Sequence, residues 1–165
     1  MAELTSIDRL QPCLLDRLTD DQPDVKLESR NQRVVSNARF KEGVLRDIRW
    51  IFNSQRHRDD DGMKDFPQVE KSVFNYGLRD LSAVLAETGD TRELEREIQE
   101  TLMLFEPRII RRTLEVHIFR PEEAGSESNP HRISLQISAD LWAQPAPEKF
   151  FAKTTIDLET GDCAM

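Results

Sequence analysis

The feature that most constrains the fold of this chain is a change in the spacing of its apolar residues. Between Phe40 and Phe52 apolar side chains recur at every fourth position, which is the spacing of one face of an α-helix. From Leu114 onward they alternate with polar residues, which is the period of a strand with one buried face. This change of spacing therefore predicts an α+β fold, with helices in the first part of the chain and strands in the second.

The central helix is expected over residues 37–56. Ser36 or Asn37 can cap it, because a side-chain oxygen at this position accepts a hydrogen bond from a free N–H of the first turn. Gly43 costs roughly 1 kcal/mol relative to alanine inside a helix, so it marks a place of close packing.

Two further helices flank the central one. A later helix starts at Asp90, which has capping-box spacing to Glu93, and ends at Pro107. A short N-terminal helix is expected over 7–18, followed by a polar linker over 24–33.

Apolar residues alternate in three groups in the last third of the chain, and each group predicts a strand. The groups are Leu114, Val116 and Ile118; Ile133, Leu135 and Ile137; and Thr154, Ile156 and Leu158. Consecutive strands favour a small antiparallel sheet formed by this C-terminal meander, with the helices packed on one face. At 165 residues the chain is expected to form a single domain, 1–165.

The net charge of the chain restricts the classes of partner that it is expected to bind. A formal net charge of −8 repels phosphate backbones and anionic lipid headgroups, so nucleic acid and membrane are not expected as partners. One small basic group is present, formed by Arg108, Arg111 and Arg112. Three arginines are a small basic patch for nucleic-acid binding, so they are interpreted as solvated side chains. The first residues lack the apolar core of a secretory signal, which predicts a cytoplasmic protein.

No motif in the sequence predicts an enzyme or a cofactor site. Glu106 is the most distinctive carboxylate, but its place at a helix end favours a structural role. The three histidines and two cysteines share no ligand spacing. The acidic link from His57 to Asp65 departs from a calcium loop, because Gln68 stands where the loop needs a bidentate glutamate. The role of this link stays open.

Two short segments predict rigid turns. Asn75, Tyr76 and Gly77 form the first, since glycine adopts positive φ without strain from a Cβ atom. Pro107 imposes the second, because it biases the preceding residue away from helical angles. Glu106 and Arg108 flank this proline and can either brace the turn or project a charge pair toward a partner.

Four segments together resemble TssE, the type VI secretion member of the phage baseplate wedge superfamily. The segments are Leu14-Leu15-Asp16-Arg17-Leu18, the stretch from Val44 to Asn53, Ser72-Val73-Phe74-Asn75-Tyr76-Gly77-Leu78 and Phe105-Glu106-Pro107-Arg108. The likeness extends to Gly161, and its most specific part is Asn-Tyr-Gly followed by Glu-Pro-Arg.

This resemblance implies a fold related to the sheath subunits of contractile tails, no cofactor, and a place in the baseplate at the inner face of the cell envelope. The partners it implies are the wedge proteins TssF, TssG and TssK and the sheath proteins TssB and TssC. It favours a structural adaptor that docks on the wedge proteins and initiates sheath assembly. The resemblance also favours partner docking by Glu106, Pro107 and Arg108 over bracing.

Two other functions belong to different classes. A peptidoglycan hydrolase is suggested by the lysozyme-like label carried by some members, although no residue pattern supports it. A regulatory anti-adaptor is the second, because the superfamily includes small proteins that sequester a response regulator. A turbidity assay on cell wall and a pull-down from native lysate separate these functions.

The strand meander supplies a further expectation. An open sheet exposes the edges of its outer strands, and an exposed edge can accept a strand from another protein through backbone hydrogen bonds. The resemblance suggests that a sheath strand adds at Ile156. Proline at Ile156 is expected to disturb that addition if the Ile156 N–H donates across the ladder.

Overall fold

The computed structural model describes Leu10 and residues 13–20, 23–24, 35–57, 65–88, 90–119, 132–143, 146–158, 160 and 163–164. The elements are α1 (Leu14–Leu18), α2 (Asn37–Phe52), α3 (Pro67–Glu70), the 3-10 turn η4 (Val73–Asn75), α4 (Leu81–Thr88), α5 (Thr91–Phe105), the 3-10 turn η5 (Arg111–Thr113), β1 (Glu115–Phe119), β2 (Arg132–Leu141), β3 (Glu148–Asp157) and β4 (Cys163–Ala164). The strand order is β1-β2-β3-β4, and every neighbouring pair is antiparallel. The predicted α+β fold with an antiparallel meander is confirmed.

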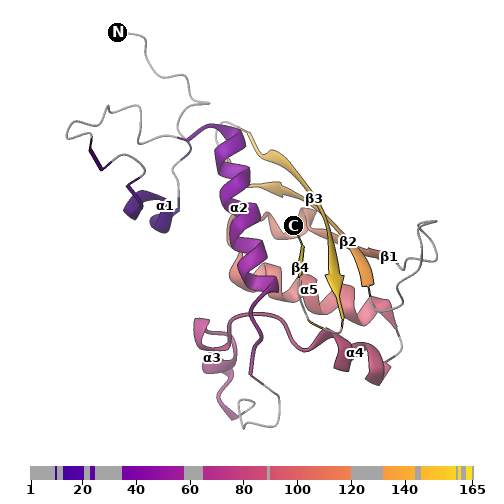
Figure 1. Cartoon of the computed structure of the whole chain (residues 1–165). Coiled ribbons are helices and arrows are strands. Elements are labelled where there is room, and N and C mark those ends of the chain that lie inside the picture. Colours follow the sequence, from indigo (N-terminus) through magenta and orange to yellow (C-terminus); the bar gives the residue numbers. More distant parts are fainter. Residues whose placement is uncertain are drawn as a thin grey trace.

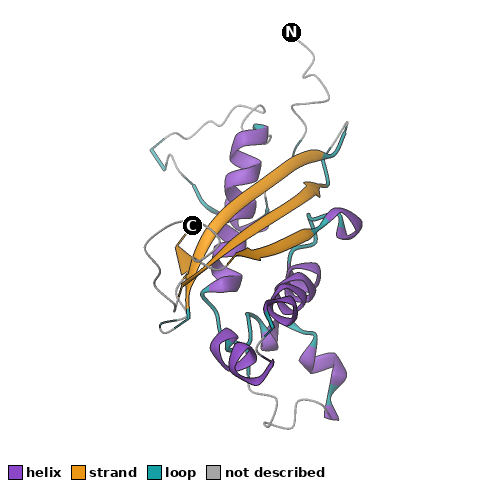
Figure 2. Ribbon diagram, turned by 90° about the vertical axis from the view of Figure 1, so that its right-hand side faces the viewer, coloured by secondary structure: helices purple, strands orange, loops and turns teal. Residues whose placement is uncertain are grey.

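One face of the sheet is buried and the other is open. Along β2 the side chains of Ile133, Leu135 and Ile137 are buried while their polar neighbours stay partly exposed. β1 and β3 show the same alternation. Helices α2 and α5 pack on the buried face, as Figures 1 and 2 show. The expectation of helices on one face is therefore also confirmed.

Helix α2 has the predicted cap and apolar face but is shorter than predicted. The Arg39 N–H donates to Ser36 Oγ at 3.3 Å. The helix ends at Phe52 rather than at residue 56, because Gln55 leaves it to form a β-bridge with Leu78. Its buried residues are Phe40, Val44, Ile48, Ile51 and Phe52.

Helix α5 begins and ends where the sequence predicts. The Asp90 carboxylate accepts a hydrogen bond from the Arg92 N–H at 2.9 Å, which caps the first turn. Glu106 forms the C-terminal cap, and Pro107 follows it. The buried face of α5 consists of Leu94, Ile98, Thr101 and Leu102.

The sequence prediction missed several elements, among them the short helix α3, helix α4 and strand β4. Helix α4 starts after Asp80, whose Oδ1 accepts hydrogen bonds from the N–H groups of Ser82 and Ala83. An aspartate before an apolar run was the signal that could have revealed this helix. Strand β4 has two residues, too few for a periodic pattern, and pairs with Thr155 and Ile156 of β3.

The N-terminal helix was predicted over 7–18 and instead begins at Leu14. Leu10 is extended and forms a β-bridge with Val35, whose N–H donates to the Leu10 carbonyl at 2.9 Å. Cys13 is also extended and stands before the first turn. Backbone pairing between Leu10 and Val35 therefore replaces the first part of the predicted helix. Apart from their ends, the predicted polar linker and the acidic link lie outside the described residues.

Candidate functional site

The turn after α5 is built around a buried carboxylate. Glu106 is 2% exposed, and its Oε1 accepts hydrogen bonds from the Arg108 backbone N–H at 3.1 Å and from Arg108 Nε at 2.7 Å. Arg108 Nη2 also contacts Glu106 Oε2. Pro107 lies between them and is exposed. The charge pair therefore closes across the turn, and the proline faces solvent.

Asp47 of α2 joins this turn to the helical layer. Its Oδ2 accepts a hydrogen bond from Arg108 Nη2 at 2.5 Å, and its Oδ1 accepts one from Arg46 Nη2 at 2.8 Å. Burial alone would lower the pKa of Arg108, but hydrogen bonds to Glu106 and the nearby carboxylates raise it, so the guanidinium stays charged. We refer to Asp16, Arg46, Asp47, Glu106 and Arg108 as the ion-pair network.

Helix α1 is attached to α2 through polar contacts. Arg46 Nη1 pairs with Asp16 Oδ1, and the Cys13 thiol donates to Asp16 Oδ2 at 2.9 Å. Gly43 lies at this contact, because an added Cβ would be 3.4 Å from Asp16 Oδ2. No residue of α1 is buried. Its leucines are exposed: Leu14 by 69%, Leu15 by 45% and Leu18 by 74%.

Acid is expected to detach α1. The hydrogen bond from Arg46 lowers the pKa of Asp16 below its ordinary value of 3.8. A lowered pKa in the folded state means that the contact stabilises the protein above pH 3.8 and is lost as pH falls through the lowered pKa. The protection of the Arg17 and Leu18 amides against hydrogen exchange, relative to the intrinsic exchange rate at each pH, should therefore fall in that window, with a loss of about 1 kcal/mol. Asp16→Asn should show fast exchange already at neutral pH, and an identical pH profile in this variant would contradict the assignment.

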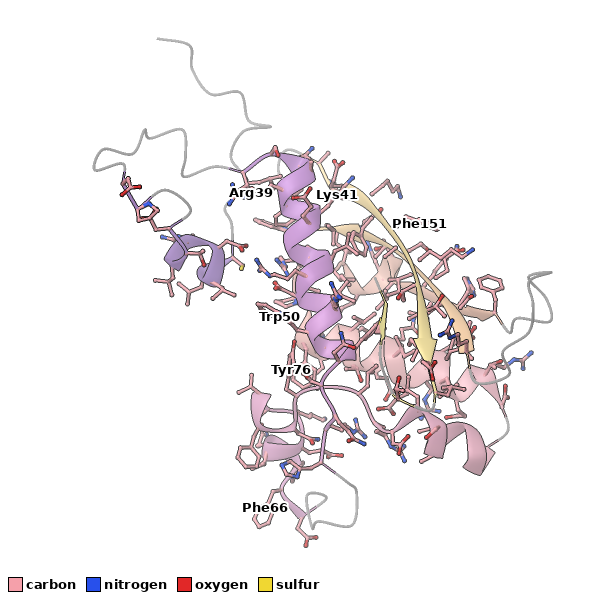
Figure 3. The ribbon with its side chains drawn as sticks, viewed as in Figure 1. Arg39, Lys41, Trp50, Phe66, Tyr76 and Phe151 are labelled. Atoms are coloured by element: carbon pink, nitrogen blue, oxygen red, sulfur yellow. The ribbon has the colours of Figure 1, made fainter. Side chains whose placement is uncertain are left out.

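An apolar groove of about 740 Å³ lies beside the ion-pair network. Asp47, Glu106 and Arg108 form its polar part. Burial, together with Asp47 and Glu106, raises the pKa of Tyr76. Figure 3 shows Trp50 and Tyr76 near the end of α2. The apolar lining includes Leu15, Phe40, Trp50, Tyr76, Phe105 and Trp142.

The turn at Asn75, Tyr76 and Gly77 positions one wall of this groove. Asn75 is 4% exposed; its Nδ2 donates to the Glu70 carbonyl at 3.0 Å and its Oδ1 accepts from the His57 N–H at 3.0 Å. Gly77 has φ +113°, a conformation that favours glycine. Tyr76 packs edge-on against the ring of Phe105, with 5.1 Å between ring centroids.

Ile156 lies away from the groove. It is 2% exposed and faces Ile133 of β2 on one side and Cys163 of β4 on the other. The Cys163 N–H donates to Asn53 Oδ1 at 2.9 Å, so it points away from β3. Ile156 and Cys163 are therefore a non-hydrogen-bonded pair, and the Ile156 N–H points toward β2. At Ile156 the sheet edge is occupied by the chain's own β4.

The structure brings together residues that are distant in the sequence. Glu106, Pro107, Arg108 and Tyr76 all line the groove, while Ile156 does not. Sequence reasoning missed Asp47 and Asp16 as partners of the arginines. Neither residue has a spacing that points to the turn, since Asp47 precedes Arg108 by 61 positions.

Both carboxylate oxygens of Glu106 accept hydrogen bonds from Arg108. No group of three or more His, Cys, Asp or Glu side chains in the described part of the chain could hold a metal ion. Among the described helices, none combines the length and apolar character required to span a bilayer.

Comparison with known proteins matches the chain to a protein family. The family described as baseplate wedge protein gp25 matches residues 38–146. The matched part runs from the start of α2 to the loop before β3, and it contains the Asn-Tyr-Gly and Glu-Pro-Arg turns. No curated protein and no solved structure matched the chain.

Proposed function

This chain belongs to the baseplate wedge protein gp25 family, which gives it a structural role in a contractile-tail baseplate, and we propose that it serves a type VI secretion system as its TssE subunit. In this role it is not an enzyme. It works in the cytoplasm at the inner face of the envelope, docks on the wedge proteins TssF, TssG and TssK, and initiates assembly of the TssB and TssC sheath.

The observation that carries the proposal is the apolar groove beside the Glu-Pro-Arg turn. Its polar groups, Asp47, Glu106 and Arg108, are paired with one another. The exposed rim consists of apolar side chains, with Trp50 exposed by 46% and Trp142 by 61%. Large exposed aromatic side chains around a preformed hollow are typical of the centre of a protein interface. In this proposal the ion-pair network holds the Glu-Pro-Arg turn in place, and the groove contacts the wedge proteins.

The wedge contact is tested with Trp142→Ala. Because Trp142 is exposed, the melting temperature should stay close to that of the wild type. Binding to purified wedge proteins should weaken by about 2 kcal/mol, roughly 30-fold, as for an aromatic residue at the centre of an interface. Phe151→Ala is the matched control, since Phe151 is 62% exposed on β3 and does not line the groove. Equal binding by Trp142→Ala and the wild type would reject the groove as the docking site.

The sheath contact is proposed along β3, before the part covered by β4. The Asp140 N–H donates to Thr113 Oγ1 at 2.8 Å, so it points away from β3. Its partner on β3, Lys149, is therefore in a non-hydrogen-bonded pair, and the Lys149 N–H points to the outer edge. By alternation the N–H groups of Phe151 and Lys153 point outward as well. Within the described residues, β4 pairs only with Thr155 and Ile156, so these three donors face no other strand.

Lys153→Pro tests this contact more cleanly than proline at Ile156. It removes an outward N–H and leaves the β2 ladder donors in place, so the chain should still fold and bind the wedge proteins. Sheath assembly on the reconstituted baseplate should be lost. Ile156→Pro would instead remove a donor that points toward β2 and is expected to unfold the sheet. Normal sheath assembly on folded Lys153→Pro would refute strand addition at this edge.

A further inference from the structure

A second apolar surface lies outside the groove and the sheet edge. Four apolar side chains from Phe66 to Phe74 are exposed, three of them by more than 60%: Phe66 by 63%, Val69 by 37%, Val73 by 83% and Phe74 by 69%. None of them belongs to the hydrophobic core. In Figure 1 this segment, with α3, lies beyond the end of α2 and away from the sheet, and Figure 3 shows Phe66 at its far end. We call residues 66–74 the apolar knob.

Local hydrogen bonds fix the backbone of the apolar knob. The N–H groups of Val69 and Glu70 donate to the Phe66 carbonyl at 2.9 and 3.0 Å. Ser72 Oγ donates to the Val69 carbonyl at 2.8 Å and accepts from the Phe74 N–H at 3.2 Å. The phenylalanines are thus presented in a set geometry, and ordering them costs little entropy when a partner binds.

Asn75 anchors the knob to the rest of the chain. Its buried amide forms hydrogen bonds with the backbone of Glu70 and of His57. His57 thus lies next to the knob in space, although it precedes Asn75 by 18 positions in the sequence. The His57 ring stacks on the ring of Phe74, with 5.7 Å between centroids and 10° between planes. The Asn-Tyr-Gly turn therefore supports the knob on one side and the groove on the other.

The exposed area indicates what kind of partner fits. With about 200 Å² for each phenylalanine and somewhat less for each valine, the exposed apolar area of the knob is roughly 450 Å². Stable dimers bury about 800 Å² on each partner. Two copies of this chain meeting through the knob alone would fall short of that area. The knob fits one contact among several within a larger assembly.

The charges around the knob indicate the rim of the partner site. Glu70 and Lys71 within the knob offset each other, as do Lys64 and Asp65 directly before it, so the charge that a partner meets is set by the rest of a chain with a net charge of −8. This balance disfavours an anionic membrane surface and favours a basic surround. We propose that the apolar knob inserts into an apolar cleft, bordered by lysine or arginine, on another subunit of the baseplate. This proposal rests on the proposed function for the baseplate assembly, and the contact it adds is separate from the groove and the sheet edge.

The direct test combines polar substitution with binding. Phe66→Ser with Phe74→Ser should lower the melting temperature only slightly, because both side chains are exposed and only the stacking of Phe74 on His57 is lost. Binding of this double variant to the purified wedge proteins should weaken at least tenfold. Phe151→Ser is the control, with the same residue type and 62% exposure on β3, and should bind as the wild type does. Wild-type affinity of the double variant would overturn the proposal, whereas Trp142→Ala reports separately on the groove.

Cross-linking in cells identifies the partner without relying on the purified wedge. A benzophenone side chain at Phe74 should give a cross-link to another protein subunit, in a peptide that contains apolar residues and lysine or arginine. A cross-link to a second copy of this chain, or no cross-link beyond that of the same probe at Leu104, an exposed residue of α5, would overturn the proposal. Binding of the chain to anionic phospholipid vesicles that depends on Phe66 and Phe74 would also overturn it. Asp65→Lys should weaken wedge binding several-fold, and unchanged affinity would overturn the basic rim.

Discussion

Arg108→Ala is expected to lower the free energy of unfolding by about 3–5 kcal/mol, the usual cost of leaving one member of a buried ion pair without its partner. The variant leaves Glu106, at 2% exposure, without its two hydrogen bonds from the Arg108 side chain. The hydrogen bond from the backbone N–H of residue 108 remains. Because domains of this size are stable by only about 5–15 kcal/mol, such a loss should shift the melting temperature markedly.

Urea unfolding measures this loss, and a double-variant cycle with Glu106→Gln separates the pair from its surroundings. Arg111→Ala is the control, since Arg111 is an exposed arginine on η5 and should change stability by less than about 0.5 kcal/mol. If Arg108→Ala instead melts like the wild type and loses only wedge binding, the pair docks a partner and does not brace the turn.

Gly77→Ala is expected to destabilise the protein by about 2–6 kcal/mol. A side chain at φ +113° is strained, at a cost of about 1–3 kcal/mol, and the added Cβ would overlap the carbonyl oxygen of Ser54, which adds about 1–3 kcal/mol. The Ser54 carbonyl also accepts the Leu78 N–H at 2.9 Å, so it cannot move without breaking that bond. Thermal and urea unfolding measure the effect.

Gly43→Ala is the matched control for this change. Gly43 lies inside α2, and a Cβ there would meet Asp16 Oδ2 at 3.4 Å, an ordinary contact distance. Alanine should therefore stabilise the helix by about 0.5–1 kcal/mol. A Gly77→Ala variant as stable as the wild type would show that the turn can be built without positive φ.

Local patterns predicted most of the fold. The spacing of Phe40, Val44 and Ile48 predicted the buried face of α2, and Asp90 predicted the start of α5, because both signals depend on neighbours within a few residues. Alternation predicted three strands for the same reason. The N-terminal helix was drawn too long because pairing of Leu10 with Val35 depends on a contact across the intervening chain.

The candidate site was predicted only in part. The Glu-Pro-Arg turn was visible as a turn, but the direction of its charges depends on Asp47, which reaches Arg108 only after α2 and α5 have packed together. The groove has no sequence signature at all, since its walls come from α1, α2, the Asn-Tyr-Gly turn, the end of α5 with the Glu-Pro-Arg turn, and the segment after β2. Tertiary packing, which no periodicity encodes, creates both.

Strand β4 has a consequence for the length and register of any strand added to β3. Because β4 covers β3 at Thr155 and Ile156, the part of the edge from Glu148 to residue 154 pairs with no other strand among the described residues. At about 3.3 Å per residue this edge is roughly 23 Å long. A strand added to this edge would meet Ala164 at one end, so β4 limits how far the added strand can extend along β3. A shift of the added strand by one residue would turn all of its side chains to the opposite face of the sheet. By fixing one end of the added strand, β4 would select the register in which its apolar side chains face the core.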